Sequence, residues 1–370
     1  MKTVCLLPVA TDARISRRLT ALERRGVPLQ VLAFERAGYP GKPMDLGFQS
    51  LGHIDHGKYF GRLGALMAAV PLVRAAMADA DVVYSFGLDL HALAWSVGRT
   101  LRRRPALVYE VADIHPTLVG AGPLARCLRA IERRLLRDTP LTVVTSQAFI
   151  TGFYAGVQKI AHVPHLLIEN KPNLGPVAAA PMRDVDAGPI TIGYFGMLRC
   201  ERSWQALEEI TARGNGRIRV YFRGVPLGLS DFTRRVAENP WMEYGGPYNA
   251  PEDLPAMYDR IDLSWNAHRV DDNNSLLWNR TNRFYEACAF RTPLVAQIGS
   301  QDGDVVADRG IGVCVDLADI DAVARRILAI DGDQFARWQR RVAGLPASVY
   351  TETTEHEELA HHIFRLANAV

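Results

Sequence analysis

The chain has 370 residues, of which 48% are hydrophobic and 22% charged, and its formal net charge is +3. This composition excludes a disordered, collagen-like or coiled-coil protein. The longest uncharged apolar run, Leu63 to Val73, is too short for a membrane-spanning helix, which needs about 20 residues. Because a single hydrophobic core rarely grows beyond about 300 residues, two domains are expected.

The N-terminal residues Met1 to Pro8 lack the features of a signal peptide, so a cytoplasmic protein is expected. Five cysteines are scattered along the chain without the spacing of a zinc site, so neither a metal centre nor a disulfide framework is predicted.

Positive charge is concentrated in the first half of the chain. Residues 1–170 hold 21 Lys and Arg against 13 Asp and Glu, whereas the remaining 200 residues hold 22 against 27. Such clusters are typical of solvated helix faces. They are also typical of a surface that approaches a lipid headgroup, a pyrophosphate-linked acceptor or nucleic acid. No nucleic-acid-binding motif accompanies them, so nucleic acid is not an expected partner.

Short β-rich runs alternate with helix-period segments in the first half. The predicted strands are 3–8, 29–34, 81–85, 106–111, 141–145 and 165–169, and the predicted helices are 15–25, 63–77, 91–102 and 124–137. Pro71 is expected to kink or split its helix. Repeated βα units favour a parallel sheet covered on both faces.

The alternation stops in a Pro-, Gly- and Ala-rich stretch and then starts again. The predicted strands are 190–195, 218–222, 262–266 and 293–298, and the predicted helices are 203–212, 230–238, 252–260, 282–290, 319–330 and 355–369. Ser230 is the expected N-cap of the second of these helices.

The pattern therefore predicts an α/β protein with two doubly wound domains. The expected boundaries are an N-terminal domain at 1–170, a linker at 171–188 and a C-terminal domain at 189–354. The last helix, at 355–370, is expected to pack back towards the N-terminal domain. Ligands of such sheets bind at the carboxyl ends of the strands, so the crevice between the halves is the expected site.

Familiar cofactor and catalytic motifs are missing from the sequence. No G-x-G-x-x-G follows the first strand, and the P-loop, G-x-S-x-G and H-E-x-x-H motifs are also absent. A ligand must therefore be held by something other than a glycine-rich phosphate cradle, and no cofactor is predicted.

One candidate segment is a strand that ends in Gly196 and is followed by Arg199, Arg202 and a helix. Glycine lets the backbone approach a ligand closely, and arginines and a helix N-terminus bind phosphate oxygens. The alternative is an ordinary strand–turn–helix with exposed arginines.

The other candidate segment begins a helix with Thr281 or Asn282 as its N-cap. Arg283 and Glu286 then lie three residues apart on one face, where they could hold the phosphate and the ribose diol of a nucleotide. The alternative is a surface salt bridge.

Together with Asn274, Ser275 and Trp278, the run from Asn282 to Ala287 resembles retaining GT-B glycosyltransferases of family 4. More narrowly, it is similar to bacterial exopolysaccharide glycosyltransferases of the succinoglycan type. The resemblance implies a GT-B fold, in which two Rossmann-like doubly wound domains face a central cleft.

The resemblance also implies roles for individual residues on the donor side. Gly196 would form the phosphate turn, Arg202 would take a position that is usually lysine, and Arg283 would lie near the diphosphate. Glu286 would bind the ribose. The resemblance further places Trp278 and Asn282 among the substrate-binding residues.

On the acceptor side, Asp12 and Arg14 lie in a segment that resembles the family's turn after the first strand. Asp113 and His115 lie in a segment that resembles the end of the family's acceptor-side strand, and the resemblance implies that they orient the acceptor. The sequence departs from the family at three positions. Trp278 replaces the first of two glutamates, and Met197 replaces an arginine, for which Arg199 is the expected substitute. Ala112 replaces a histidine; either His115 or Asp113 takes its place, or catalysis does not need it.

The function implied is retaining, metal-independent transfer of a sugar from a nucleotide-sugar donor, with UDP as the expected nucleotide. The acceptor would be a glycan or a polyprenyl-pyrophosphate-linked glycan in polysaccharide biosynthesis, with peripheral contact to the inner face of an anionic plasma membrane. One alternative is a non-catalytic nucleotide-sugar-binding module or partner subunit. A sugar-nucleotide 2-epimerase is a further one, although its acid/base residues are not found.

Overall fold

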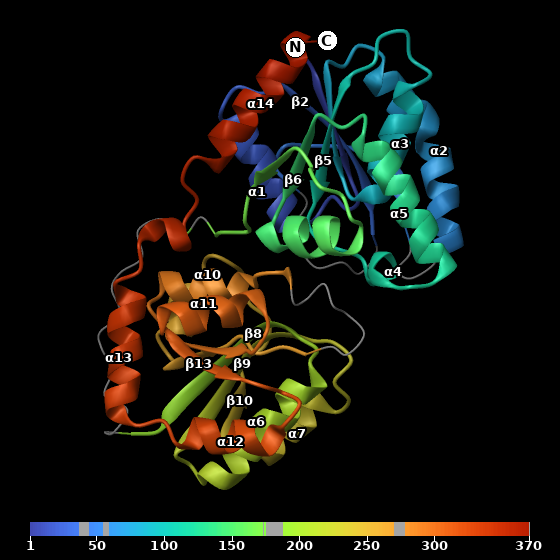
Figure 1. The fold of residues 1–370 in the computed structure, drawn as a ribbon. Coiled ribbons are helices and arrows are strands. Elements are labelled where there is room, and N and C mark those ends of the chain that lie inside the picture. Colours follow the sequence, from blue (N-terminus) through green and yellow to red (C-terminus); the bar gives the residue numbers. More distant parts are fainter. Residues whose placement is uncertain (37–43, 55–58, 173, 175–187, 270–277, 370) are drawn as a thin grey trace. The chain divides into compact units, whose positions relative to one another are not determined.

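A computed structural model describes residues 1–36, 44–54, 59–172, 174, 188–269 and 278–369. The chain divides into two compact units, each built of α/β layers (Figure 1). The first unit comprises Met1–Glu169 and Thr353–Val370, and the second comprises Asn170–Glu352. Within the expected linker, residues 173 and 175–187 lie outside the described part of the chain.

The first unit is built on a parallel sheet with the strand order β3-β2-β1-β4-β5-β6-β7. Its strands are β1 (Thr3–Leu7), β2 (Leu29–Glu35), β3 (Gln49–His53), β4 (Val82–Phe86), β5 (Ala106–Val111), β6 (Leu141–Val144) and β7 (His165–Leu167). Its helices are α1 (Ala13–Glu23), α2 (Tyr59–Met77), α3 (Leu88–Gly98), α4 (Pro116–Val119), α5 (Pro123–Leu136), the π-helix η1 (Phe149–Val157) and α14 (Glu355–Ala369).

Both faces of this sheet are buried, because side chains alternate along each strand. On β1, Cys5 and Leu7 belong to the core beneath α1 and α14, whereas Val4 and Leu6 belong to the core beneath α2 and α3. Ile363 of α14 is fully buried in the first of these cores. Figure 1 shows the two groups of helices on opposite sides of the sheet. The first unit is therefore doubly wound, as predicted.

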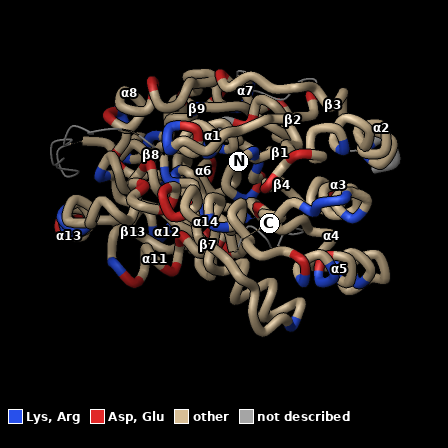
Figure 2. Tube along the Cα trace, turned by 90° about the horizontal axis from the view of Figure 1, so that it is seen from above, with Lys and Arg blue, Asp and Glu red and all other residues tan. Residues whose placement is uncertain are grey.

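The basic residues of the first unit gather on its helices. Figure 2 shows Lys and Arg near the end of α3 and along α5. Arg126, Arg133, Arg134 and Arg137 are exposed on or directly after α5. Cys127, also on α5, is an exposed thiol, unlike the buried Cys5, Cys200 and Cys288.

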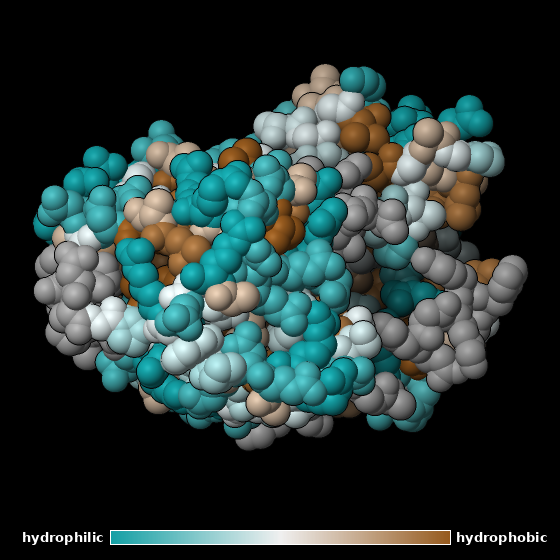
Figure 3. Space-filling view, turned by 90° about the horizontal axis from the view of Figure 1, so that it is seen from below, coloured by the Kyte–Doolittle hydropathy of each residue, from teal (hydrophilic) through white to brown (hydrophobic). Residues whose placement is uncertain are grey.

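Hydrophilic residues cover most of the face shown in Figure 3, with hydrophobic residues in smaller patches. Among the described residues, no helix combines the length and the apolar character needed to span a membrane.

The second unit contains a parallel sheet with the strand order β10-β9-β8-β11-β12-β13. Its strands are β8 (Ile190–Leu198), β9 (Ile218–Pro226), β10 (Met242–Tyr244), β11 (Leu263–Trp265), β12 (Leu294–Gln297) and β13 (Gly312–Val315). Its helices are α6 (Glu201–Gly214), α7 (Phe232–Glu238), α8 (Leu254–Tyr258), α10 (Asn282–Ala289), α11 (Gln301–Arg309), α12 (Ile320–Leu328), α13 (Gly332–Ala343) and the 3-10 helix η2 (Ala347–Val349).

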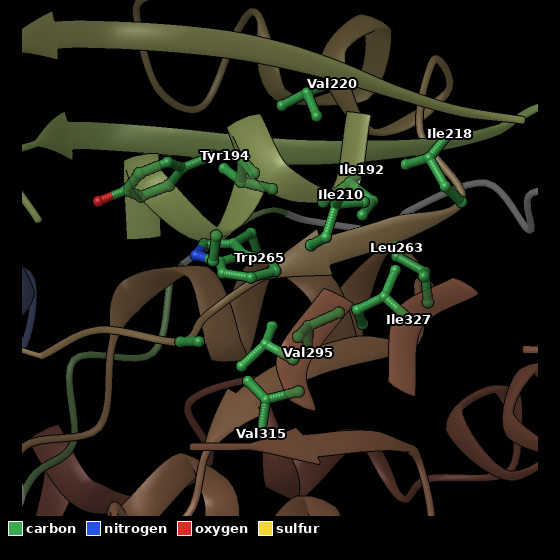
Figure 4. Close-up of a cluster of buried hydrophobic side chains, with 14 of the residues drawn as sticks. Ile192, Tyr194, Ile210, Ile218, Val220, Leu263, Trp265, Val295, Val315 and Ile327 are labelled. Carbon is green, nitrogen blue, oxygen red and sulfur yellow. The ribbon is translucent and has the colours of Figure 1, made fainter. Parts of the chain in front are cut away.

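The second sheet is also covered on both faces. Tyr194 of β8 belongs to the core shared with α6 and α12, part of which Figure 4 shows. The next residue, Phe195, points to the opposite core, where it packs edge-on against Tyr258 of α8. Successive residues of β8 thus place the strand end between two helical layers.

Of the two outcomes predicted for Pro71, a split of the helix is wrong, because α2 runs through Pro71 without a break. Pro71 and Met67 both lie on the exposed face of α2, so water can bond the Met67 carbonyl that loses its helical partner. Buried Ala69 and Val73 hold the helix on the sheet on either side of the proline.

The prediction that Ser230 is an N-cap is also wrong. The helix begins at Phe232, and the residue before it, Asp231, has a left-handed backbone with φ of 53° and makes no side-chain cap. Phe232 is buried against Trp204 and Phe222, so tertiary packing determines where this helix starts.

Candidate functional site

A pair of glycines shapes the end of β8. Gly196 has a φ of +95° and is paired in register with Gly224 of β9, which has a φ of +127°. A β-carbon on Gly224 would lie 1.9 Å from the Gly196 carbonyl oxygen. The two backbones therefore approach each other more closely than any side chain would allow.

Arg283 connects the two segments that the sequence singled out. Its Nη1 donates a 2.7 Å hydrogen bond to the carbonyl oxygen of Phe195, directly before the glycine turn. Its guanidinium carbon lies 5.2 Å from the centre of the Tyr194 ring. A β-carbon on Gly196 would lie 3.6 Å from the same Nη1. The first turn of α10 thus places a cation over the end of β8.

The N-terminus of α10 is fixed by polar side chains from elsewhere in the unit. Thr281, one of the two predicted caps, accepts a 3.2 Å hydrogen bond from the backbone N–H of Phe284. Its hydroxyl donates to Asp302 at 2.7 Å and accepts from Asn266 at 3.1 Å. Asp302 is almost fully buried, and this burial raises its pKa to about 6, although the hydrogen bonds from Thr281 oppose the shift. Asp302 and Asn266 were not found from the sequence.

Glu286 lies one turn further along α10 and is only 6% exposed. Its Oε2 accepts a 3.2 Å hydrogen bond from the hydroxyl of Tyr258. Burial, together with the charge of Glu286, raises the pKa of Tyr248 well above its ordinary value, while Arg283 opposes the shift. The Tyr248 hydroxyl also lies 3.8 Å from the position of a β-carbon on Gly196. Gly196, Arg283, Glu286 and Tyr248 therefore form one polar cluster, of which Tyr248 was not predicted.

The other predicted donor-side residues lie near the starts of α6 and α10. Arg199 is exposed before α6, Arg202 is exposed in its first turn, and Asn282 is the exposed first residue of α10. Trp278 is half-buried. Asn274 and Ser275, which carry part of the family resemblance, lie outside the described residues.

His268 is a further residue near these cations that sequence reasoning missed. Burial and the positive charges of Arg283 and Arg199 lower its pKa to about 3. A single histidine after a short strand carries no sequence signal of its own, so only its surroundings identify it.

In the first unit, Asp12 is the N-cap of α1. Its Oδ1 accepts hydrogen bonds from the backbone N–H groups of Arg14 and Ile15, at 2.9 and 3.1 Å. A guanidinium nitrogen of Arg14 lies 3.6 Å from Asp12 Oδ2. The predicted pair is therefore together at the carboxyl end of β1.

A buried carboxylate that was not predicted lies beside this pair. Glu110, at the end of β5, is fully buried, and its Oε1 lies 3.4 Å from Arg18 and 4.0 Å from Arg14. Tyr84 donates a hydrogen bond to its other oxygen. The signal in the sequence was a glutamate inside an otherwise apolar strand, since such a charge is seldom buried unless it is paired.

Asp113 and His115 follow β5, where the sequence placed them, and both are exposed. His115 is the N-cap of α4, and its Nδ1 accepts from the backbone N–H of Thr117 at 3.3 Å. Asp12, Arg14, Asp113 and His115 thus all lie at the carboxyl edge of the first sheet.

No protein-family model matches the chain. The chain is 27% identical over 369 residues to the succinoglycan biosynthesis protein ExoL of Rhizobium meliloti, a match that covers 96% of this chain and 91% of ExoL.

Solved structures resemble the chain over its whole length. Sucrose-phosphate synthase from Thermosynechococcus elongatus matches with a TM-score of 0.72 and 16% identity, covering all of both chains. HepE from Anabaena, solved in complex with UDP, matches with a TM-score of 0.68 and 15% identity, also over all of both chains. WaaG, a glycosyltransferase involved in lipopolysaccharide biosynthesis, matches with a TM-score of 0.65 and 14% identity, covering 98% of this chain and 99% of WaaG. The predicted fold is therefore confirmed: the chain has the GT-B fold of glycosyltransferases such as WaaG, and in sequence it is similar to a protein of succinoglycan biosynthesis.

Proposed function

We propose that the chain is a glycosyltransferase of exopolysaccharide biosynthesis that uses a UDP-linked sugar as its donor. The observation that carries this proposal is that Arg283 lies over the end of β8 beside Gly196, while the buried carboxylate of Glu286 follows one turn later on the same helix. The similarity to ExoL supports the pathway, and the complexes of the structurally similar HepE with UDP and UDP-glucose support the donor class.

In the proposed donor site, the diphosphate lies against the Gly196 turn. Arg199, Arg202 and Arg283 stabilise the negative charge that develops on the leaving diphosphate, and Glu286 bonds the ribose hydroxyls. Trp278 and Asn282 contact the donor at the start of α10.

We propose a retaining reaction in which the departing phosphate oxygen accepts the proton of the acceptor hydroxyl. The bond from the anomeric carbon to the diphosphate breaks, and the acceptor oxygen bonds to the same face of the sugar. The arginines stabilise the negative charge that develops on the leaving diphosphate, so the proposed reaction requires no metal. Asp12, Arg14, Asp113 and His115 orient the acceptor, a glycan or a polyprenyl-pyrophosphate-linked glycan.

The test is a transfer assay with a panel of UDP-sugars and lipid-linked acceptors. Glu286→Gln and Arg283→Lys each remove a charged hydrogen bond worth about 1.5–3 kcal/mol, so kcat/KM is expected to fall about 10- to 100-fold. Glu238→Gln, on the exposed end of α7, is the control and keeps full activity.

The outcomes of this assay separate the candidate functions. Full activity of either site variant would overturn the residue assignment. Binding of UDP-sugars without turnover would indicate a binding module, and inversion at C2 of the sugar would indicate an epimerase. The anomeric configuration of the product, read by NMR, decides retention, and an unchanged rate in EDTA is expected if no metal takes part.

We further propose that the protein contacts the inner face of the plasma membrane through α5. Exposed Arg126, Arg133 and Arg137 accompany Leu124 and Ile131, which are 61% and 42% exposed. Figure 2 shows the basic positions along α5. Each basic residue near an anionic surface contributes about 1 kcal/mol of attraction. Sedimentation at low salt is expected to show binding to phosphatidylglycerol vesicles and little to phosphatidylcholine vesicles, and equal binding to both would refute the contact.

A further inference from the structure

His268 is a half-buried imidazole whose two ring nitrogens lack a hydrogen-bond partner among the described residues. It lies three residues after the end of β11, and neither of its ring nitrogens is accessible to solvent. Neither nitrogen has a partner within the part of the chain that the structure describes. Leaving a buried polar group unpaired costs about 1–3 kcal/mol, so such groups in native proteins call for an explanation.

The backbone on both sides of His268 is fixed to the start of α6. The carbonyl of Ala267 accepts a 2.9 Å hydrogen bond from the hydroxyl of Ser203. The backbone N–H of Arg269 donates to Cys200 Sγ at 3.2 Å, and this thiol donates to the carbonyl of Arg269 at 3.0 Å. His268 is therefore held beside the first turn of α6.

The charges around His268 favour an anion as its missing partner. The positive charges of Arg283 on α10 and Arg199 before α6, together with burial, disfavour protonation of the His268 ring. Arg202 and Glu201 are exposed in the first turn of α6, and Glu286 on α10 is bonded to Tyr258. A neutral imidazole offers one N–H donor, which adds to the two guanidinium groups and to the positive end of the α6 dipole.

We propose that His268 binds the diphosphate of the donor, donating its ring N–H to a phosphate oxygen held between Arg199 and Arg283. The identity of the ligand rests on the proposed function, whereas the preference for an anion rests on the residues around the ring.

The experiment measures the binding of UDP, uridine and inorganic pyrophosphate by titration calorimetry. His268→Ala is expected to weaken UDP and pyrophosphate about tenfold, which corresponds to about 1.4 kcal/mol, and to leave uridine unchanged. His268→Asn keeps an N–H donor, so it is expected to retain most of the affinity. His162→Ala, at an exposed position in the first unit, is the control.

Several outcomes would overturn the assignment. One is that the wild type and His268→Ala bind UDP with equal affinity and bind pyrophosphate with equal affinity. Another is that His268→Ala loses as much affinity for uridine as for UDP, which would indicate a structural role. If the wild type binds pyrophosphate but no nucleoside diphosphate, the proposed function fails and the pyrophosphate comparison decides the role of His268. If the wild type binds neither, both proposals fail. The unfolding temperature of His268→Ala is expected to equal or exceed that of the wild type, because the variant removes an unpaired buried group.

Discussion

Arg283 shows how one side chain makes a site from two distant segments. It lies 88 residues after Phe195 in the chain, yet its Nη1 bonds the Phe195 carbonyl at 2.7 Å. Lysine could not make this contact while also stacking on Tyr194, since a guanidinium is planar and has several donors in fixed directions. The stacked arginine therefore keeps its remaining donors in a fixed place beside the glycine turn.

A second residue whose environment changes its chemistry is Glu132 of α5, which is 1% exposed. It accepts hydrogen bonds from the hydroxyls of Tyr109 and Tyr154, both at 3.0 Å, and from the side chain of Gln158. Burial nevertheless raises its pKa from 4.5 to about 7. Because the folded state binds this proton more tightly than the unfolded state, the contribution of Glu132 to stability falls between about pH 4.5 and pH 7 and is constant above that range.

We predict that Glu132→Gln removes this pH dependence. The free energy of unfolding of the variant, relative to that of the wild type, should rise by up to about 3 kcal/mol between pH 4.5 and pH 8. Urea denaturation at pH 4.5, 6 and 8 measures the difference, with Glu238→Gln as an exposed control. A difference that stays constant across these pH values would show that Glu132 does not titrate as described.

At the scale of elements, β8 and β9 of the second unit approach each other closely at a pair of glycines. Gly224 has no room for a side chain, because a β-carbon would meet the carbonyl of Gly196 at 1.9 Å. Gly228, four residues later, also has a positive φ, of +77°, but nothing lies within 4 Å of its added β-carbon. An alanine at Gly224 would therefore meet both a steric clash and backbone strain, whereas an alanine at Gly228 would meet backbone strain alone.

We predict that Gly224→Ala destabilises the second unit by about 2–4 kcal/mol, since it combines a strained backbone with overpacking between two strands. Gly228→Ala carries the backbone strain alone and should cost about 1 kcal/mol. Thermal unfolding of both variants checks the order. Equal costs at the two positions would mean that β9 moves away from β8 without penalty.

At the scale of the whole molecule, the chain returns to its first unit after completing the second. Helix α14 packs against α1, β4 and β7, and its Leu359 and Ile363 are fully buried in the core of the first unit. The last residues of the chain are therefore a structural part of the unit formed by its first residues.

We predict that Ile363→Ala destabilises the first unit by about 2–5 kcal/mol, through lost burial and the cavity left behind. Arg365→Ala, two residues later on the exposed side of α14, should leave stability within about 0.5 kcal/mol. In calorimetry, the transition of the first unit should move to lower temperature. A shift confined to the transition of the second unit would contradict the placement of α14.

Much of the fold could be predicted from local pattern. Apolar runs such as 106–111 and periodic segments such as 124–137 are long enough to identify strands and helices and to predict two doubly wound sheets. Strands 49–53, 242–244 and 312–315 were missed because they are short or do not alternate clearly, and their pairing partners lie elsewhere in the chain. The N-cap of α10 was predicted because capping depends on neighbouring residues.

The sequence by itself thus determined the α/β alternation, the parallel sheets and which segments carry the glycine turn, the arginines and Glu286. Only the tertiary structure decided that Arg283 reaches Phe195, that Gly196 and Gly224 face each other, and that the ring nitrogens of His268 are shielded from solvent near two cations. Secondary structure follows from residues within a few positions of one another, whereas a site depends on side chains that long-range packing brings together. The same reason explains why α2 continues through Pro71 and why α7 starts at Phe232, since burial against the rest of the unit outweighed the local preference of the sequence.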